Sequence, residues 1–182
     1  MSIELTQLEG TFALDPSHTR IGFVTRHAMV TKVRGSFNSF EGTAATGVGL
    51  ENASISVEID AASVDTRNEQ RDEHLRSADF FDVEQYGKIK FVSTEITAPD
   101  ADVLRVTGNL TIKDVTRPVT IDFEYQGSVI DPWGNTRVGL EGSVVVNRKD
   151  FGLTWNAVLE AGGVLVSEKA TLEFEVAAVK VS

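Results

Sequence analysis

Apolar and polar residues alternate over most of this chain, which is the spacing of a β-strand with one buried and one wet face. The clearest stretch is 119–125 (VTIDFEY), in which every second residue is apolar. Residues 18–28 and 33–44 are rich in Phe, Val and Thr and are expected to add two strands. Four further stretches alternate in the same way: 55–59, 104–112, 138–146 and 172–176. The pattern therefore predicts about eight strands.

Local signals mark a bulge and two turns. In the segment 89–92 (IKFV) the apolar positions change from odd to even, which predicts a β-bulge. The stretch 131–135 (DPWGN) has turn chemistry, because Pro presets φ and Gly permits a positive φ. The pair Gly162 and Gly163 also favours a turn. Both stretches are expected to be hairpin tips.

One polar segment, from Thr66 to about Asp82, interrupts the alternation and is expected to form a helix. Thr66 and Glu69 have the spacing of a capping box, in which the hydroxyl and the carboxylate satisfy free backbone amides at the helix start. The apolar end of the segment must be buried, and the open mouth of a barrel is a suitable place. We therefore expect a plug or lid that buries Leu75, Ala78, Phe80 and Phe81.

About eight strands joined by short turns fit either a closed barrel or a two-sheet sandwich, and alternation alone cannot choose between them. An eight-stranded barrel is just wide enough to hold one small ligand. A strand of eight residues spans about 26 Å, so the interior would suit an elongated guest. With 182 residues and no break in composition, residues 1–182 are expected to form a single domain.

The charge of the chain disfavours some partners. There are 17 Lys and Arg against 27 Asp and Glu, a net charge of −10, so the surface should repel nucleic acid. The same charge opposes standing adsorption to anionic lipid headgroups. No run approaches the roughly 20 apolar residues of a membrane-spanning helix, so no stable membrane insertion is expected. Residues 1–10 lack the pattern of a secretory signal, which predicts a cytoplasmic protein.

Four groups of residues form motifs that follow one another from about residue 12 to residue 176: 14–18 with Phe23, His27 and 35–37; 63–66 with 71–82; 106–112 with 115–119; and 147–153. Together they resemble the YceI-like family, bacterial proteins with a lipocalin-like barrel that bind polyisoprenoids. The second group is the most specific. The resemblance implies a mainly β fold, an eight-stranded antiparallel β-barrel with one short helical lid. Since relatives are often dimers, it also implies a homodimer.

The resemblance further implies binding, storage or transport of a long apolar lipid, such as a polyprenyl diphosphate or an isoprenoid quinone, without catalysis. Phe suits such an interior because it has no polar group to satisfy, although ordinary close packing also uses it. Small residues at Gly35, Gly108, Gly139 and Gly142 are expected to leave room for the guest. The expected ligand-binding residues are Phe23, His27, Phe37, Val57, Ile59, Arg71, His74, Leu75, Phe80, Phe81, Phe91, Leu110, Ile112, Phe123, Leu140, Trp155 and Phe174.

Histidine is the residue type that most often binds metal or carries protons near neutral pH. The spacing of His18, His27 and His74 matches no metal-binding motif, so neither a metal nor a cofactor is expected. The ordinary alternative to metal binding is that these histidines form hydrogen bonds to carboxylates or to the backbone. The chain has no Cys and no Gly-x-Ser-x-Gly motif, which leaves few nucleophiles.

Two arginines and one carboxylate leave further alternatives open. Arg71 or Arg148 suits a lipid phosphate, while anchoring of the helix is the other use of Arg71. An enzyme that uses His27, His74 and Asp72 as proton carriers is the second hypothesis for function. A protein-interaction module is the third, and it predicts a filled barrel without a deep cavity.

Overall fold

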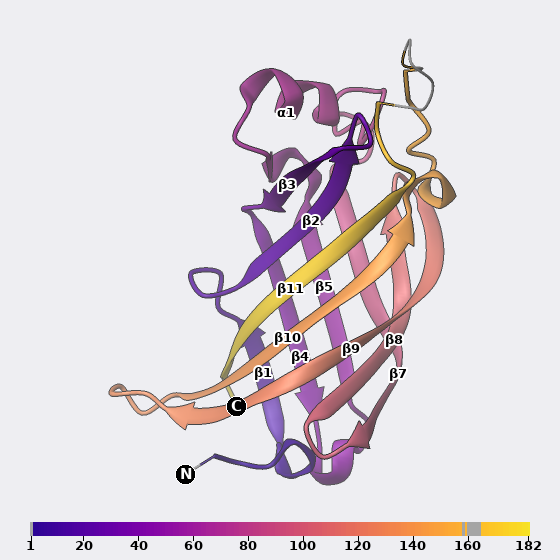
Figure 1. The fold of residues 1–182 in the computed structure, drawn as a ribbon. Helices are drawn as coiled ribbons and strands as arrows, with labels where there is room; N and C mark the ends of the chain where they lie inside the picture. Colours follow the sequence, from indigo (N-terminus) through magenta and orange to yellow (C-terminus); the bar gives the residue numbers. More distant parts are fainter. Residues whose placement is uncertain (1, 158, 160–164) are drawn as a thin grey trace.

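A computed structural model describes residues 2–157, 159 and 165–182 (Figure 1). Its described part contains one α-helix, α1 (Glu69–Arg76), and four short 3-10 helices, η1 (Leu5–Gln7), η2 (Val48–Leu50), η3 (Ala61–Ser63) and η4 (Arg148–Phe151). The strands are β1 (Gly10–Leu14), β2 (Arg20–His27), β3 (Thr31–Phe37), β4 (Phe40–Thr46), β5 (Ser54–Asp60), β6 (Val64–Asp65), β7 (Lys88–Asp100), β8 (Val103–Ile112), β9 (Val115–Ile130), β10 (Thr136–Asn147) and β11 (Lys169–Lys180).

The strands close into a barrel whose wall has eight positions. β1 and β2 both pair with β11, each along a different part of it, so together they fill one position. β4 pairs with β1 and β3 pairs with β2, which makes the second position, and β5 and β6 make the third in the same way. The long strands β7 to β11 complete the ring, and every pairing is antiparallel. The predicted eight-stranded antiparallel barrel is confirmed.

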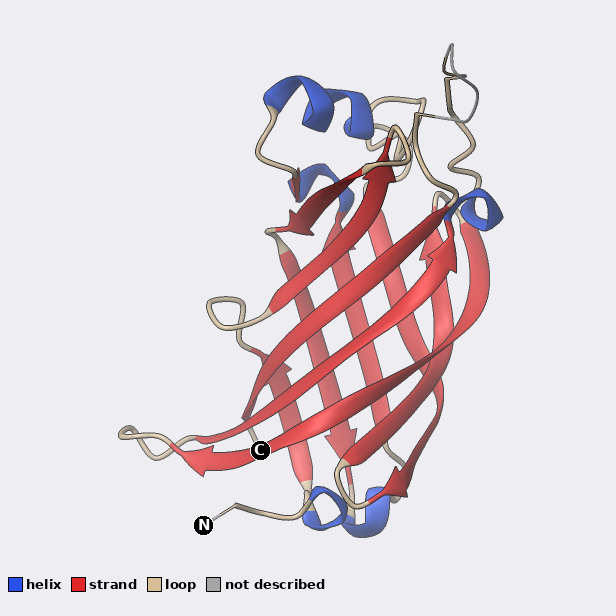
Figure 2. Cartoon of the chain, viewed as in Figure 1, coloured by secondary structure: helices blue, strands red, loops and turns tan. Residues whose placement is uncertain are grey.

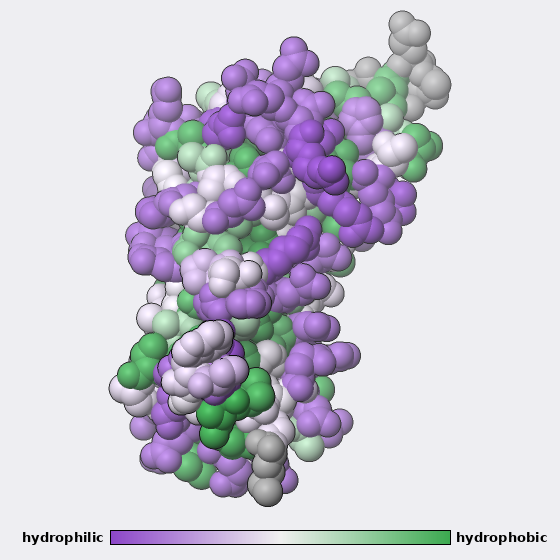
Figure 3. Space-filling view, turned by 90° about the vertical axis from the view of Figure 1, so that its left-hand side faces the viewer, coloured by the Kyte–Doolittle hydropathy of each residue, from purple (hydrophilic) through white to green (hydrophobic). Residues whose placement is uncertain are grey.

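Buried and more exposed side chains alternate along β8, as the sequence pattern predicts. Polar residues cover most of the face shown in Figure 3, where apolar residues form scattered patches. The bulge predicted at 89–92 is misplaced. Ile89 and Phe91 both line the interior, whereas Val92 points outward and is 53% exposed. β7 is irregular at two places, between Ser93 and Glu95 and between Thr97 and Asp100, and at the first of these, polar residues hide the change of phase.

The helical segments lie at the two ends of the barrel (Figure 2). α1 begins at Glu69 and ends at Arg76, so the helix is shorter than predicted. The predicted capping box is wrong, because the side chain of Asn68, not of Thr66, accepts the hydrogen bond from the amide of Arg71. Beyond Arg76 the chain continues as turns to residue 82, which carry Phe80 and Phe81 back to the core, where Leu75 of α1 also packs. The expected burial of Ala78 is wrong, because this residue is exposed in the turn.

The opposite end of the barrel is closed by an element that the alternation did not predict. Leu5, on η1, is only 2% exposed and packs with Leu8 and Phe12 in the lower part of the core. η2 lies beside η1 and adds Leu50 to the same cluster. The barrel is therefore covered at its lower end by the N-terminal segment and at its upper end by α1 (Figure 1).

Of the two predicted hairpin tips, the one at 131–135 is confirmed. It joins β9 to β10, and Gly134 has a φ of +84°, as a turn glycine should. Gly162 and Gly163 lie outside the described residues. Among the described residues, none of the helices combines the length and the apolar character needed to cross a bilayer.

Candidate binding cavity

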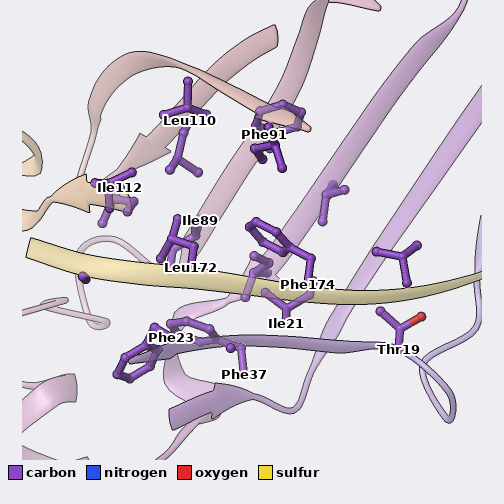
Figure 4. Close-up of a pocket in the computed structure, with 18 of the residues that line it drawn as sticks. Thr19, Ile21, Phe23, Phe37, Ile89, Phe91, Leu110, Ile112, Leu172 and Phe174 are labelled. Atoms are coloured by element: carbon purple, nitrogen blue, oxygen red, sulfur yellow. The ribbon is translucent and has the colours of Figure 1, made fainter. Parts of the chain in front are cut away.

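The barrel encloses an apolar cavity of about 620 Å³. The cavity runs through both halves of the core, from the cluster under α1 to the cluster above η1. This volume falls within the range of about 300–1,000 Å³ that is usual for small-molecule sites. Figure 4 shows side chains from opposite walls, such as Phe23 on β2 and Phe91 on β7, pointing into the same space. The interior is therefore hollow, and the filled-core alternative fails on this point.

Every residue that the sequence analysis expected in the ligand site lines this cavity. Period-2 alternation placed the strand residues correctly, because it directly identifies the face that points inward. Whether these side chains contact a ligand stays a prediction. They are Phe23, His27, Phe37, Val57, Ile59, Arg71, His74, Leu75, Phe80, Phe81, Phe91, Leu110, Ile112, Phe123, Leu140, Trp155 and Phe174.

The prediction missed much of the lower half of the cavity. Leu104 and Val106 on β8 continue the inward face of Leu110, so the alternation contained the signal for them. Leu5 and Leu8 lie in a segment with no periodic pattern, and only the folded chain shows that they close the lower end.

The sequence analysis expected the interior glycines to leave open space, but this expectation is wrong for three of them. A Cβ atom on Gly35 would lie 2.3 Å from the Phe23 ring, and one on Gly108 would lie 2.5 Å from the Phe91 ring. Gly142 is covered by Phe123 in the same way, at 2.8 Å. Gly139 differs, since it lies opposite Gly127 at the bulge of β9. Each of the first three glycines thus lets an aromatic ring lie flat along the wall, and the cavity remains between the rings.

Aromatic rings contact one another around the upper part of the cavity. The Phe37 ring lies 5.8 Å from that of Phe23 and 5.6 Å from that of Phe81, which joins β2 and β3 to the segment after α1. Lower down, Phe123 and Phe174 are 6.0 Å apart. These centroid distances are usual for favourable aromatic pairs.

The start of α1 is held by a buried network around Thr66. The Thr66 hydroxyl and amide both donate to Oδ1 of Asp72, at 2.6 and 2.8 Å. Arg71 donates from Nε to the hydroxyl oxygen and from Nη2 to the carbonyl oxygen of Thr66, both at 2.7 Å. Thr66 is only 3% exposed. Arg71 is therefore engaged in anchoring the helix, which was the alternative to its binding a lipid phosphate.

Arg148, which is 6% exposed, has a comparable structural role on the other side of the cavity. Its guanidinium donates to the carbonyl oxygens of Leu153, Trp155, Val166 and Ser167, at distances of 2.6 to 3.2 Å. Burial lowers the pKa of Arg148, and the nearby carboxylate of Glu168 acts against that shift.

The three histidines have different surroundings. His74 pairs with Asp79 at 2.9 Å, and its ring lies edge-on to Trp155 and Phe80, with centroids 4.5 and 5.1 Å away. His18 pairs with Asp15 in the break between β1 and β2 and does not line the cavity. His27 lines the cavity at the end of β2.

The proton-carrier set of the enzyme hypothesis is not assembled by hydrogen bonds. Asp72 is bound to Thr66, and the carboxylate that orients His74 belongs to Asp79. Within the described ranges, no three His, Asp or Glu side chains are arranged to hold a metal ion. The polar groups around the cavity thus serve mainly to fix α1 and the chain after η4.

Comparison with known proteins agrees with this architecture. A sequence model of the YceI-like domain matches residues 12–178. A UPF0312 protein of Pectobacterium atrosepticum is 40% identical over 147 residues, which are 80% of this chain and 76% of the relative. The crystal structure of Burkholderia cenocepacia BcnA has a TM-score of 0.78 at 21% identity, covering 90% of this chain and 98% of that one.

A polyisoprenoid binding domain from Saccharophagus degradans, implicated in plant cell wall breakdown, gives a TM-score of 0.70 at 14% identity and covers 93% of this chain and 98% of that one. At these identities the two structures show a shared fold. The match over nearly the whole sequence goes further, and it shows that the chain belongs to the YceI-like family.

Proposed function

We propose that the protein binds an isoprenoid lipid, a polyprenyl chain or an isoprenoid quinone, in the barrel and carries or stores it without changing it. The observation that carries the proposal is the apolar cavity of about 620 Å³, which runs along the barrel between its two covered ends. A structural neighbour from Saccharophagus degradans is described as a polyisoprenoid binding domain, which supports the same class of ligand.

The size of the cavity sets the scale of the guest. At the roughly 30 Å³ that one water takes in the liquid, the cavity has room for on the order of 20 non-hydrogen groups. Four isoprene units supply that number, and a longer chain would extend from the mouth. Burial contributes roughly 4 kcal/mol per five-carbon unit, so apolar contact alone accounts for firm binding once association costs are subtracted.

The absence of catalysis is part of the proposal. The candidate proton carriers bind other partners, because Asp72 holds Thr66 and His74 holds Asp79. Turnover of a bound isoprenoid that disappears in a His74→Ala variant would contradict this part. A cytoplasmic location and a homodimer remain predictions of the sequence analysis.

Tryptophan fluorescence offers a direct test, because the chain has two Trp residues in contrasting places. Trp155 lines the cavity, whereas Trp133 is 80% exposed at the β9–β10 tip. In a Trp133→Phe variant, titration with a quinone that has a prenyl tail should quench the Trp155 emission to saturation. The matched Trp155→Phe variant should show only weak, unsaturable quenching. Equal quenching of the two variants would count against binding in the barrel.

A further inference from the structure

The charge of this chain is unevenly distributed. Between Asp15 and Glu41 there is no carboxylate, although the chain has 27 in all. The Lys and Arg residues in this interval lie on the hairpin of β2 and β3 and are Arg20, Arg26, Lys32 and Arg34. A protein with a net charge of −10 thus carries one cationic hairpin.

The cations of β3 point to the outside of the barrel. Lys32 and Arg34 alternate with Val33, which lines the cavity, and both are exposed. Arg26 lies directly opposite Lys32 in the ladder. Like charges at directly opposed positions are destabilising, so this pair favours an anionic partner.

The cationic surface continues onto β11. Lys169 is exposed and is the first residue of β11. It lies two residues before Thr171, which pairs with Val24 of β2. Glu173, further along β11, pairs with Arg20 at 3.5 Å and reaches Arg34 at 4.0 Å. The Glu173 carboxylate is set back from the tip, and that of Glu168, beside Lys169, is paired with Lys149 at 2.8 Å. Positive charge therefore dominates on the hairpin toward its end.

The tip of the same hairpin is apolar and exposed. Met29 is 62% exposed and Val30 is 74% exposed. Ala28 and Met29 have positive φ angles of +49° and +67°, a conformation that favours Gly or Asn. The chain thus has apolar side chains at a turn where other residues would be more stable.

This tip lies at the mouth of the cavity. The amide of Ala28 donates to the carbonyl oxygen of Leu165 at 2.8 Å, and His27 forms a β-bridge with Val166. His27, Leu165 and Val166 all line the cavity. In Figure 1 the hairpin ends beside α1, at the upper end of the barrel.

We propose that the tip of the β2–β3 hairpin docks the protein on an anionic lipid membrane and holds the cavity mouth against the bilayer for exchange of its ligand. Met29 and Val30 enter the headgroup region while Arg26, Lys32, Arg34 and Lys169 contact anionic headgroups. The net negative charge of the remainder keeps the contact brief and turns the mouth toward the membrane. The exchange step rests on the proposed function, whereas the docking step does not.

Vesicle flotation of the full chain tests the docking. Vesicles of phosphatidylcholine with 30 mol% phosphatidylglycerol are compared with vesicles of phosphatidylcholine alone. The wild-type protein should float with the anionic vesicles and be released by salt. The triple variant Lys32→Gln, Arg34→Gln, Lys169→Gln should bind about 100-fold more weakly, since each cation near the surface contributes about a fivefold factor.

A matched control removes the same charge elsewhere. Lys88, Lys90 and Arg105 lie on the outer faces of β7 and β8, and their replacement by Gln should leave flotation as in the wild type. A Met29→Asn, Val30→Ser variant should bind at least tenfold more weakly, because the apolar tip is lost. Asn tolerates a positive φ, so this variant should keep its thermal unfolding temperature.

The proposal is overturned if the wild type floats equally with both kinds of vesicle, if it floats with neither, or if the two triple variants lose binding equally. The fluorescence titration with a prenyl quinone, done without vesicles, tests the proposed function separately from the docking proposal. The Lys32, Arg34 and Lys169 side chains do not line the cavity, so quenching in that triple variant should match the wild type. Quenching without flotation would reject only the docking, and flotation without quenching would reject only the cargo.

Discussion

At the scale of single residues, the guanidinium of Arg148 holds the chain on either side of the cavity mouth. It binds four backbone carbonyl oxygens, two from the chain after η4 and two from the chain that leads to β11. Without it the carbonyl oxygens of Leu153, Trp155 and Ser167 would lose this donor, whereas that of Val166 also accepts from Asn156 Nδ2 at 2.8 Å. A buried carbonyl group left without a donor costs about 1–3 kcal/mol. Phe80 lies against the same guanidinium, with its ring centroid 6.0 Å from Cζ.

We expect Arg148→Met to lower the free energy of unfolding by at least about 3 kcal/mol, because several carbonyl groups lose their donor together. Hydrogen exchange should also become faster at the amides of Leu165 and Val166, whose hydrogen bonds join the two sides. Urea unfolding measures the first effect. Lys149→Met, which removes a neighbouring exposed cation, is the control and should change stability little. Equal stability of the two variants would contradict this role of Arg148.

The residues of the cavity wall were predictable because alternation specifies a face directly. The roles of the polar residues were only partly predictable: anchoring of the helix by Arg71 and pairing of His74 with a carboxylate were among the alternatives, but the helix cap was not found. Thr66 has the sequence spacing of a cap, yet it is buried and binds Asp72, while the next polar residue but one, Asn68, caps the helix. Ser, Thr, Asn and Asp all satisfy local backbone groups, so sequence spacing alone does not show which one does so.

At the scale of elements, a charge cluster joins the break between β1 and β2 to the β9–β10 hairpin. Arg137 donates to carboxylate oxygens of Asp15 and Asp131, both at 2.7 Å. The Ser17 hydroxyl, Arg137 and His18 hold the pKa of Asp15 well below its usual range. Desolvation raises the pKa of Asp131, but hydrogen bonds from the Asn135 amide, Arg137 and the Trp133 amide outweigh it and bring the value to about 2.

This cluster predicts a loss of stability in acid. A carboxyl group whose folded pKa is depressed stabilises the fold above its unfolded pKa, and this contribution is lost as the pH falls through the folded value. For Asp131 the window runs from about pH 4 down to about pH 2. As the pH falls through this window, the thermal unfolding temperature should decrease less steeply in Asp131→Asn than in the wild type. If the unfolding temperatures of the two proteins change with pH in parallel, the ion pair between Asp131 and Arg137 contributes nothing to stability.

The segment after α1 is expected to act as a lid. Phe80 is 6% exposed and packs on Trp155, and Phe81 packs on Phe37. Replacement of both Phe80 and Phe81 by Ser removes about 1.5–3 kcal/mol of apolar contact per side chain and admits water. Dissociation of a bound prenyl lipid should therefore accelerate while far-ultraviolet circular dichroism stays rich in β-structure. If the variant unfolds outright, the segment belongs to the structural core and is no lid.

Element boundaries were harder to predict than the presence of the elements. The helix was found from its polar run, but the run continues through turns to residue 82, and polar turns and polar helices have similar composition. The first irregularity in β7 falls between Ser93 and Glu95, where no apolar residue marks the change of face. Periodicity reports a boundary only when an apolar residue stands next to it.

At the scale of the whole molecule, the alternation predicted strands but left a barrel and a sandwich equally open. Closure depends on the pairing of β1 with β11, in which Phe12 lies opposite Lys180. No local pattern can specify a contact between the two ends of the chain, and the family resemblance supplied it. The same holds for the N-terminal segment, whose apolar residues are identified as a lower cover only by the cluster they join.

The length of the cavity should determine which chains fit. Ala178 lines the lower half and is 7% exposed, so Ala178→Phe should fill room comparable to one isoprene unit. Binding of a four-unit prenol should weaken by up to about 4 kcal/mol, while that of a three-unit prenol changes little. Ala177→Phe, on the next residue, which does not line the cavity, is the matched control. The affinities of the two prenols are measured by their competition with the prenyl quinone in the fluorescence titration. An equal loss of affinity for the two prenols would contradict a cavity of limited depth.

The central claim, that the barrel holds an isoprenoid lipid, is tested most directly by organic extraction of gently purified protein followed by mass spectrometry. We expect a prenyl quinone or polyprenyl lipid in a near-stoichiometric amount, at a much lower level after purification of the Phe80→Ser, Phe81→Ser variant. An extract without isoprenoid, from protein that also fails to take up added quinone or polyprenol, would contradict the claim.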